Sequence, residues 1–333
     1  MLAAIIQFSI AAAVIVGAGI MLTSCADAFA ERTGLGRLLV GSVFLAAATS
    51  LPELTVNVNA IWLKLPDLAI GNIVGSSLFN LLILAAVDLA HRSRGGLLSR
   101  AAAAHSLSGA VTIALTSIVG IGILFEPQLD GLSFLGLGPA AIGVFVGYAF
   151  GIRLIFFDQH ASLADEPKRN DASARTGLAL RSAVVGYIVA GIAIYLAAPF
   201  LAGAAGQLAE HTRLGGTFIG TTLVALATSL PEFVATLAAV RIRAFDLAIG
   251  NIFGSNAFNM LLLLPLDLAF PGALLASVSA THALTCFAVI LITTMVVLGQ
   301  LYRVERRIFL IEPDAALVIT LVFGALWMVY LAR

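Results

Sequence analysis

Residues 41–90 read GSVFLAAATSLPELTVNVNAIWLKLPDLAIGNIVGSSLFNLLILAAVDLA, and residues 220–269 read GTTLVALATSLPEFVATLAAVRIRAFDLAIGNIFGSNAFNMLLLLPLDLA. The two segments align without a gap, at a fixed offset that pairs position 41 with position 220, and 25 of their 50 positions are identical. Similarity at a fixed offset indicates an internal repeat. The sequence therefore predicts two halves that share one structural plan.

The composition around these repeats is that of a membrane protein. Of the 333 residues, 60% are hydrophobic and 11% are charged, whereas a soluble domain has about 25% charged residues. The 18 Lys and Arg residues balance the 18 Asp and Glu residues, which disfavours a nucleic-acid binder. Cys25 and Cys286 are too few to predict a disulfide framework or a metal cluster. Residues 1–30 contain no Lys or Arg, so a retained first helix is expected instead of a cleaved signal.

Ten apolar runs are each long enough to cross a bilayer, which takes about 20 residues. They cover residues 2–24, 38–62, 68–89, 101–124, 132–156, 178–203, 216–240, 246–269, 274–300 and 313–332. The longest polar joint, 158–177, is predicted to be a cytoplasmic loop between a first five-helix half (1–157) and a second (178–333).

The cationic residues predict the orientation of these spans. With the N-terminus outside, 15 of the 18 Lys and Arg residues fall in joints that face the cytoplasm, and only Lys64, Arg213 and Arg333 fall outside. Five spans per half is an odd number, so the second half enters the membrane from the opposite side. We expect an all-α polytopic membrane protein with ten transmembrane helices in two inverted five-helix repeats, both termini outside, and a site near the midplane.

Two glutamates occupy equivalent positions within the predicted spans. Glu53 and Glu232 each follow a proline, and an ionisable side chain at this depth is costly unless it serves an ion or an aqueous site. Pro52 and Pro231 remove a helical N–H and leave a carbonyl oxygen one turn earlier without its helical partner. Such free carbonyls persist at membrane depth only where they line protein or water. The pattern predicts a site for a cation.

Neutral oxygen donors accompany both glutamates. Hydroxyls precede each Pro-Glu pair, and further hydroxyls and amides follow on the next predicted helix. These donors are Thr49, Ser50, Ser76 and Asn80 in the first repeat, and Thr228, Ser229, Ser255 and Asn259 in the second. Asn72 and Asn251 are expected to hold the backbone. Glycines that allow close helix approach or a local break are Gly71, Gly75, Gly250 and Gly254.

Four polar residues near the ends of the predicted spans have structural interpretations. Asp67 and Asp246 each open a helix and are predicted to be N-caps. His105 and His282 lie early in the fourth and ninth spans, where polar packing or an interface role is favoured over proton relay.

The predicted centre offers oxygen ligands and a charge of −2 from its two carboxylates. The absence of Cys and His from both motifs disfavours copper, zinc and iron. A flexible oxygen cage suits Ca²⁺, which takes about 6–8 oxygens, better than the rigid octahedron that Mg²⁺ demands. Na⁺ also accepts such ligands. These residues indicate a cation antiporter and leave the counter-ion open.

The motif ATSLPE…DLAIGN…GSxxFN occurs in both repeats and resembles the α-repeats of the sodium/calcium exchanger family, of prokaryotic type, in the calcium/cation antiporter superfamily. The resemblance covers the ten-helix layout, and the two 50-residue segments in detail. It implies electrogenic exchange, typically of three Na⁺ for one Ca²⁺, with spans 2–24 and 178–203 sliding across the rest. The short central loop has no room for the calcium-sensing domains of animal exchangers.

The resemblance also implies which residues bind the ions. In this family the glutamate of each SLPE motif binds Ca²⁺ and Na⁺, and these glutamates match Glu53 and Glu232. The other implied ligands are Ala46, Thr49, Ser50, Ser76 and Asn80, with Ala225, Thr228, Ser229, Ser255 and Asn259 in the second repeat.

One departure from the family pattern bears on the coupled ion. Asn259 stands where potassium-dependent relatives and some prokaryotic exchangers have Asp, which argues against K⁺ co-transport. The segments GNIVGSS and GNIFGSN lack the acidic residue of proton-coupled relatives, so Na⁺ is the favoured counter-ion. The alternative is a Ca²⁺/H⁺ antiporter that uses the same glutamates. An intramembrane hydrolase built on Ser50 or Ser229 would lack a nearby His or Lys base, and a channel fits the inverted repeat less well.

We therefore expect a transporter, not an enzyme, that exchanges Na⁺ for Ca²⁺ by alternating access. It is expected to be a multi-pass protein of the cell (inner) membrane that works as a monomer in the lipid bilayer. Ca²⁺ and Na⁺ are its expected substrates, with no cofactor and no nucleic-acid partner.

Overall fold

Helices form the secondary structure of this protein wherever the structure describes it. A computed structural model describes residues 1–90, 102–129, 133–165, 177–211, 225–302 and 313–331. Within these ranges there is no strand, only an isolated β-bridge between Phe134 and Leu137. The α-helices are α1 (Leu2–Thr33), α2 (Arg37–Leu39), α3 (Ala46–Thr49), α4 (Leu51–Trp62), α5 (Pro66–Ala90), α6 (Ala102–Phe125), α7 (Pro139–Asp165), α8 (Leu180–His211), α10 (Leu230–Arg241), α11 (Phe245–Leu261), α12 (Leu263–Ala269), α13 (Thr281–Tyr302) and α14 (Pro313–Leu331). A π-helical segment, η1 (Val40–Leu45), joins α2 to α3, and short 3₁₀ turns are η3 (Glu126–Gln128) and η4 (Leu275–Ser277). The predicted all-α class is confirmed.

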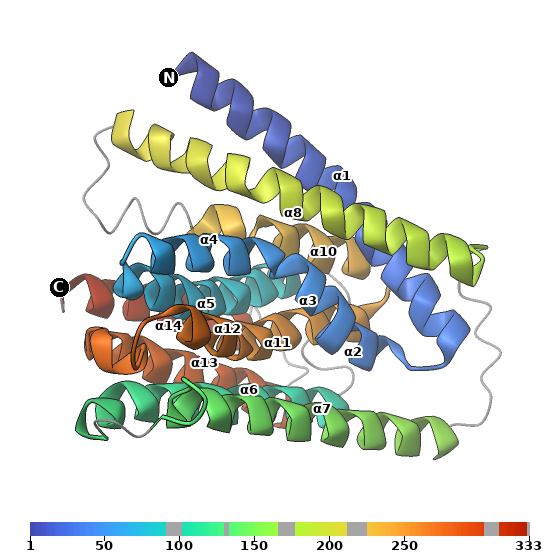
Figure 1. The fold of residues 1–333 in the computed structure, drawn as a ribbon. Helices are drawn as coiled ribbons and strands as arrows, with labels where there is room; N and C mark the ends of the chain where they lie inside the picture. Colours follow the sequence, from blue (N-terminus) through green and yellow to red (C-terminus); the bar gives the residue numbers. More distant parts are fainter. Residues whose placement is uncertain (91–101, 130–132, 166–176, 212–224, 303–312, 332–333) are drawn as a thin grey trace.

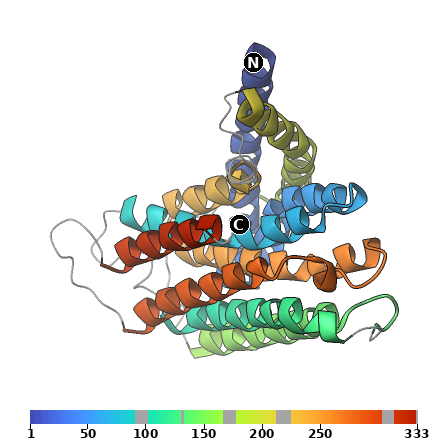
Figure 2. The same ribbon diagram turned by 90° about the vertical axis from the view of Figure 1, so that its left-hand side faces the viewer.

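The helices pack in layers (Figure 1). The two long helices α1 and α8 lie side by side across one face, and α6 and α7 lie on the opposite face. Between them are α4, α5, α10 and α11, and α13 packs against α6. Figure 2 shows α1 and α8 standing clear of the remaining helices when the bundle is viewed from its end. The start of α1 and the end of α14 lie at the same end of the bundle (Figure 1).

The two outer helices are longer than the bilayer requires. Each has 32 residues, or about 48 Å at about 1.5 Å per residue, against a hydrocarbon core of about 30 Å. A helix of this length fits by tilting, and both cross the other helices obliquely (Figure 1). Gly34 ends α1 in the left-handed conformation, with φ of 70°, and its N–H donates to Ala30 O at 3.1 Å.

Seven helices in the described ranges are long and apolar enough to cross a membrane. They are Leu2–Thr33, Pro66–Ala90, His105–Gln128, Pro139–Ala161, Leu180–Leu208, Phe245–Ala269 and Thr281–Leu301. The bent pair Arg37–Thr49 and Leu51–Trp62 would make an eighth span, and Ala315–Leu331 is a shorter apolar helix. The predicted span 216–240 begins outside the described residues, which resume at residue 225 and include α10. The predicted count of ten remains a prediction.

The helix bounds recur at the offset of the sequence repeat. Helix α10 begins and ends at the positions that the repeat pairs with the two ends of α4, and α13 begins at the position paired with the start of α6. The single helix α5 corresponds to α11 and α12 together, which are interrupted at Leu262. Pro265 stands in this second copy where α5 has Ala86, and proline removes a helical N–H and crowds the preceding turn.

Several predictions fall wholly or partly outside the described residues. Helix α7 continues to Asp165, and residues 166–176 of the predicted loop 158–177 are not described. The same holds for many of the cationic residues that predict the orientation, namely Arg92, Arg94, Arg100, Lys168, Arg169, Arg175, Arg213, Arg303, Arg306, Arg307 and Arg333.

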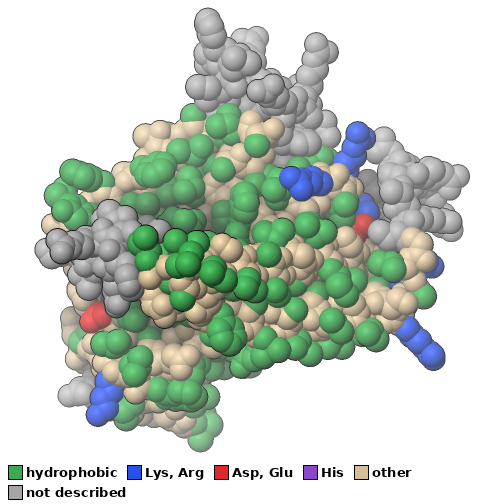
Figure 3. Space-filling model, turned by 90° about the horizontal axis from the view of Figure 1, so that it is seen from above, with side chains coloured by type: hydrophobic (Ala, Val, Ile, Leu, Met, Phe, Trp, Pro, Cys, Tyr) green, Lys and Arg blue, Asp and Glu red, His purple; other side chains and the backbone are tan. Residues whose placement is uncertain are grey.

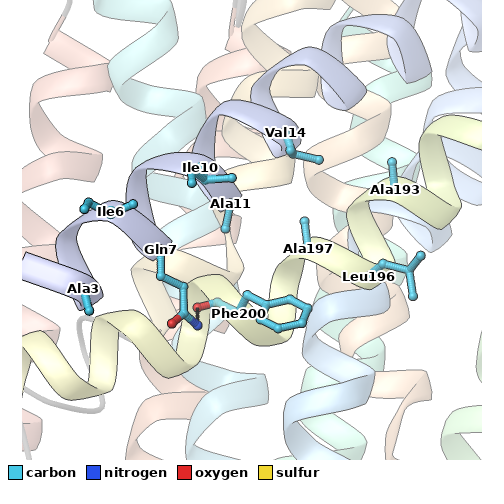
Figure 4. A pocket seen from close by; sticks show the side chains of 10 residues that line it. All are labelled: Ala3, Ile6, Gln7, Ile10, Ala11, Val14, Ala193, Leu196, Ala197 and Phe200. Carbon is cyan, nitrogen blue, oxygen red and sulfur yellow. Dashed lines mark hydrogen bonds between the residues drawn. The ribbon is translucent and has the colours of Figure 1, made fainter.

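The exterior is largely apolar. Figure 3 shows a face covered by hydrophobic side chains, with most of its Lys and Arg side chains toward one end of the helices. Large apolar residues are widely exposed, among them Phe150 at 61% and Trp327 at 62%. An apolar groove of about 710 Å³ runs between α1 and α8, where Gln7 Nε2 donates to Phe200 O at 3.2 Å (Figure 4). Such a surface suits contact with lipid.

Asp67 and Asp246 are not N-caps, so that prediction is wrong. Each helix starts one residue earlier, which places the aspartate at its second position, and its side chain contacts the other half of the chain. Asp67 Oδ1 accepts a hydrogen bond from the N–H of Ser279 at 2.7 Å and lies 3.1 Å from His282 Nε2. Asp246 Oδ1 lies 3.2 Å from His105 Nε2. These contacts agree with the packing role predicted for the histidines.

Candidate cation site

Both Ser-Leu-Pro-Glu motifs interrupt their helices in the same way. Ser50, between α3 and α4, has φ of −86° and ψ of 8°, and Ser229, before α10, has φ of −82° and ψ of 4°. The proline that follows cannot donate into the preceding turn, and the first of these breaks bends the chain by 44°. Glu53 and Glu232 therefore lie in the first turn of a new helix, where the helix dipole favours a negative charge.

The two carboxylates are buried and face hydroxyls from the opposite repeat. Glu53 and Glu232 are each 1% exposed. Ser50 Oγ donates to Glu232 Oε1 at 3.2 Å, and the hydroxyl of Thr228 interacts with Glu53. Ser76, from the same repeat as Glu53, is a further neighbour of this carboxylate, but its hydroxyl forms no hydrogen bond within the described ranges. The two carboxylates also interact with each other. The fold thus brings two carboxyl groups, one from each repeat, into one polar cluster.

The main-chain oxygens implied as ligands lie at the ends of these interrupted helices. Ala46 O is 3.2 Å from Thr49 Oγ1, and Ala225 O accepts from Thr228 Oγ1 at 3.0 Å. Each of these carbonyls also accepts a backbone N–H from four residues further along the chain. A carbonyl has two lone pairs, so either oxygen could meet a cation once the threonine hydroxyl turns away. The same turn would present the hydroxyl oxygen to that cation.

Close packing of α11 on η1 brings oxygens of the two repeats together. A Cβ on Gly254 would overlap the backbone of Ser42, and one on Gly250 would lie 2.7 Å from a carbonyl oxygen of α2. Only glycine permits this approach. As a result, Thr49 Oγ1 lies 3.3 Å from Ser255 Oγ.

The two amides predicted as ligands have different surroundings. Asn80 Nδ2 donates to Asn256 Oδ1 at 2.9 Å, and Asn80 Oδ1 has no hydrogen-bond partner in the described ranges. Neither amide atom of Asn259 has such a partner among the residues described. Ser229 Oγ is likewise unpartnered there, and Ser229 lines an apolar cavity of about 510 Å³ between α1, α5, α8 and α10.

All twelve predicted site residues are buried, but they are not all connected. Contacts link Thr49, Ser50, Glu53, Ser76, Thr228, Glu232 and Ser255 into one cluster, and Ala46 and Ala225 bond its threonines. Asn80, Asn259 and Ser229 lie on the same elements, with no described contact to either carboxylate. We call the connected set the central cluster.

Sequence reasoning missed three polar residues beside this cluster. Asn72 Nδ2 donates to Asn57 Oδ1 at 2.9 Å, and Asn251 Nδ2 donates to Thr236 Oγ1 at 3.1 Å. These equivalent pairs support the structural role predicted for Asn72 and Asn251. The available signal was the repeat offset, because Asn57 and Thr236 each lie four residues after a site glutamate. The third residue is Asn256, for which the repeat offers no equivalent amide.

The central cluster suits hard cations. Within the described ranges, no Lys or Arg forms an ion pair with either site glutamate. The same ranges contain no group of three or more His, Cys, Asp and Glu side chains that could hold a metal ion together. Two buried carboxylates without cationic partners are costly, and positive charge bound beside them would offset that cost. Their neighbours are hydroxyl and carbonyl oxygens, which are the ligands of Ca²⁺.

Comparison with known proteins shows which family shares this sequence. Residues 3–154 and 182–333 match the sodium/calcium exchanger protein family. The chain belongs to that family. The resemblance first recognised in the two motifs is thereby confirmed. This is a family of transporters rather than a class of enzymes.

Individual relatives of this exchanger-family protein cover most of its length. CaxA of Alkalimonas amylolytica, named as an antiporter, is 28% identical over 84% of this chain and 86% of its own. The inner membrane protein YrbG of Escherichia coli is 29% identical over 75% of each chain. Among solved structures, the sodium-calcium exchanger NCX_Mj matches with a TM-score of 0.71 and 19% identity, covering 97% of each chain, and so shares the fold.

Proposed function

We propose that this protein exchanges Na⁺ for Ca²⁺ across the membrane. One observation supports this proposal most strongly: Glu53 and Glu232 are buried at equivalent positions, interact with each other, and face hydroxyls of the opposite repeat. Both cations accept oxygen ligands. They therefore compete for one set of oxygens, and exclusive occupancy by one or the other couples their movements.

The charge of the central cluster supports electrogenic exchange. Its two carboxylates carry −2 when ionised, which one Ca²⁺ neutralises and three Na⁺ exceed by one positive charge. Exchange at that ratio moves net charge and responds to membrane voltage. Asn259 adds no third carboxylate, which supports transport that does not depend on K⁺.

The proposed ligands are the twelve residues predicted from sequence. Carboxylates are supplied by Glu53 and Glu232, amide oxygens by Asn80 and Asn259, main-chain oxygens by Ala46 and Ala225, and hydroxyls by Thr49, Ser50, Ser76, Thr228, Ser229 and Ser255. Support comes from their burial and from the contacts of the central cluster.

Alternating access is proposed to use α1 and α8. These helices lie together on one face of the bundle (Figure 2). Their polar contacts to the bundle include Thr23 Oγ1 to Ala235 O at 3.3 Å and a hydrogen bond from the Tyr187 hydroxyl to Phe44 O. A sliding movement would have to break these contacts and an ion pair between Asp27 and Arg37.

The remaining proposals concern placement in the cell. The chain is proposed to work as a monomer in the inner membrane, with two inverted five-helix halves and both termini outside. Most of the Lys and Arg side chains on the face in Figure 3 lie toward one end, which supports a cytoplasmic location for that end.

Uptake of radioactive Ca²⁺ into proteoliposomes of the purified protein tests the proposal. An outward Na⁺ gradient should drive uptake, and an imposed voltage should change its rate. Electroneutral exchange would refute the three-to-one ratio. The same measurement with external K⁺ present and absent tests independence of K⁺.

A Ca²⁺/H⁺ antiporter is the second candidate. Two buried carboxylates that interact electrostatically can take up protons, and two bound protons would neutralise the pair in place of Na⁺. Under this alternative, a pH gradient alone would drive Ca²⁺ uptake and a Na⁺ gradient would not.

A further inference from the structure

Asn256 of α11 connects two groups on α5. Its side chain is fully buried, at 0% exposure. Its Nδ2 donates to Ser77 O at 3.2 Å, and its Oδ1 accepts from Asn80 Nδ2 at 2.9 Å. Through this one amide, Asn256 joins α11 of the second repeat to Asn80, a proposed ligand in the first repeat.

The first of these bonds determines the direction of the second. The main-chain oxygen of Ser77 can only accept, so the NH₂ group of Asn256 must face it. The oxygen of Asn256 then faces Asn80 and can only accept, so Asn80 donates to it through its own NH₂ group. The oxygen of Asn80 is turned away from both, and it is buried without a hydrogen-bond partner in the described part of the chain.

We propose that Asn256 is a positioning residue that holds the Asn80 amide with its oxygen toward the transported cation. This inference rests on the proposed function. An amide binds a metal ion through its oxygen only, because its NH₂ group offers no lone pair in the amide plane. A side chain held in that orientation needs no reorganisation when the ion arrives.

The first repeat has no such device. The residue equivalent to Asn256 is Ser77, whose hydroxyl donates to Ile73 O of its own helix at 3.1 Å. Asn259, the amide equivalent to Asn80, has neither atom bonded within the described ranges. The two amides are therefore inequivalent: a hydrogen bond orients Asn80, whereas no hydrogen bond within the described ranges orients Asn259.

The test is a double-mutant cycle on Ca²⁺ uptake in proteoliposomes, with the apparent KM for Ca²⁺ and the maximal rate measured separately. Asn256→Ser introduces the residue of the first repeat. It should raise the KM roughly 3- to 10-fold, the effect of about one lost hydrogen bond, and change the maximal rate less.

In the background of the second mutation, Asn80→Asp, we expect Asn256→Ser to lower the KM instead of raising it. In Asn80→Asp the introduced carboxylate has no donor, so its oxygens meet the oxygen of Asn256 lone pair to lone pair. Adding Asn256→Ser removes this repulsion and supplies a hydroxyl donor. The double variant should therefore have a lower KM than Asn80→Asp alone, a coupling that mere loss of packing would not produce.

Asn57→Thr is the matched control, because it places the residue of the second repeat at another buried amide. Asn57→Thr should change the KM in the same direction in the Asn80→Asp background as in the unaltered protein. Additive effects of Asn256→Ser and Asn80→Asp on KM would overturn the inference while Ca²⁺ exchange by the unaltered protein upheld the proposed function. If the unaltered protein moved no Ca²⁺ under any gradient, the proposed function would fail, and this inference with it.

Discussion

The repeat at residues 41–90 and the repeat at 220–269 carry the same proposed ligands, yet they hold them by different means. In the first repeat, α5 is one continuous helix and Ser77 bonds within it. In the second repeat, Pro265 divides the corresponding helix and Asn256 reaches across to α5. The proposed ligand positions agree between the repeats, and the differences lie at neighbouring positions that hold them.

This contrast shows how a duplicated sequence yields a site whose two sides differ. Identical Ser-Leu-Pro-Glu motifs produce nearly identical helix breaks, so both glutamates enter the cluster from equivalent directions. Side chains that hydrogen-bond across the repeats are not duplicated, and therefore each amide is held differently. The predictions below test whether the two repeats contribute equally.

The largest effect is expected at the glutamates. Glu53→Gln and Glu232→Gln should each lower Ca²⁺ uptake by about 100-fold or more, because each removes one of the two charges that attract the cation. Glu126→Gln is a matched control, since Glu126 is also buried but bonds the N–H of Ala140 away from the cluster. Near-normal uptake by either site variant would show that its repeat is dispensable.

The next largest difference between the repeats is expected in the stability of variants with alanine at equivalent glycines. Gly254→Ala would drive a Cβ into the backbone of Ser42, at a cost of about 1–3 kcal/mol in the free energy of unfolding. At Gly75, the equivalent position, a Cβ meets nothing within 4 Å among the described atoms. Thermal unfolding in detergent should show a lower melting temperature for Gly254→Ala than for Gly75→Ala. Equal shifts would contradict the close approach of α11 to η1.

An ion pair at the end of α1 should have an intermediate effect. Arg37 Nε lies 2.5 Å from Asp27 Oδ1, and Asp27 is buried, so Arg37→Gln leaves a carboxylate without its cation. The expected loss is about 1–2 kcal/mol, since Arg37 itself is partly exposed. The second repeat has Gly206 and Gly216 at these positions. Asp27→Asn combined with Arg37→Gln should cost less than the sum of the two single changes, and strict additivity would argue against the pair.

The smallest effect is expected at the histidines. Replacing either His105 or His282 by Gln should change the free energy of unfolding by at most about 1 kcal/mol, because each contacts a partly exposed aspartate. His105→Gln should cost more than His282→Gln, because Asp67 keeps the N–H of Ser279 when His282 is lost. Chemical denaturation of both variants measures the order, and the reverse order would contradict this account.

Much of the central cluster could be predicted because its signals are local. The Pro-Glu pairs break the helix through a missing N–H, and the hydroxyls precede them within the same turn. The repeat then identified, for each site residue assigned in the first copy, an equivalent residue in the second copy. Glu53, Glu232, Thr49 and Ser50 all lie in contact networks that the repeated motif led us to expect.

Other features depended on partners far along the chain. Asp67 has the sequence context of an N-cap, but its helix starts a residue earlier and its oxygen bonds Ser279, 212 residues away. Asn80 and Asn256 are 176 residues apart, and no local rule connects them. A hydrogen bond between separate helices forms only when packing has aligned them, so its existence is not encoded in either neighbourhood alone.

Local chemistry in the chain was sufficient for the membrane class, the repeat, the two helix breaks and the residues able to hold a hard cation. These properties follow from hydropathy, from proline geometry and from side-chain donor types, all of which act within a few residues. Tertiary structure alone decided which hydroxyl meets which carboxylate and which way the Asn80 amide turns. Those choices depend on the close approach of α11 to η1 and α5, which depends on all the helices packed around them.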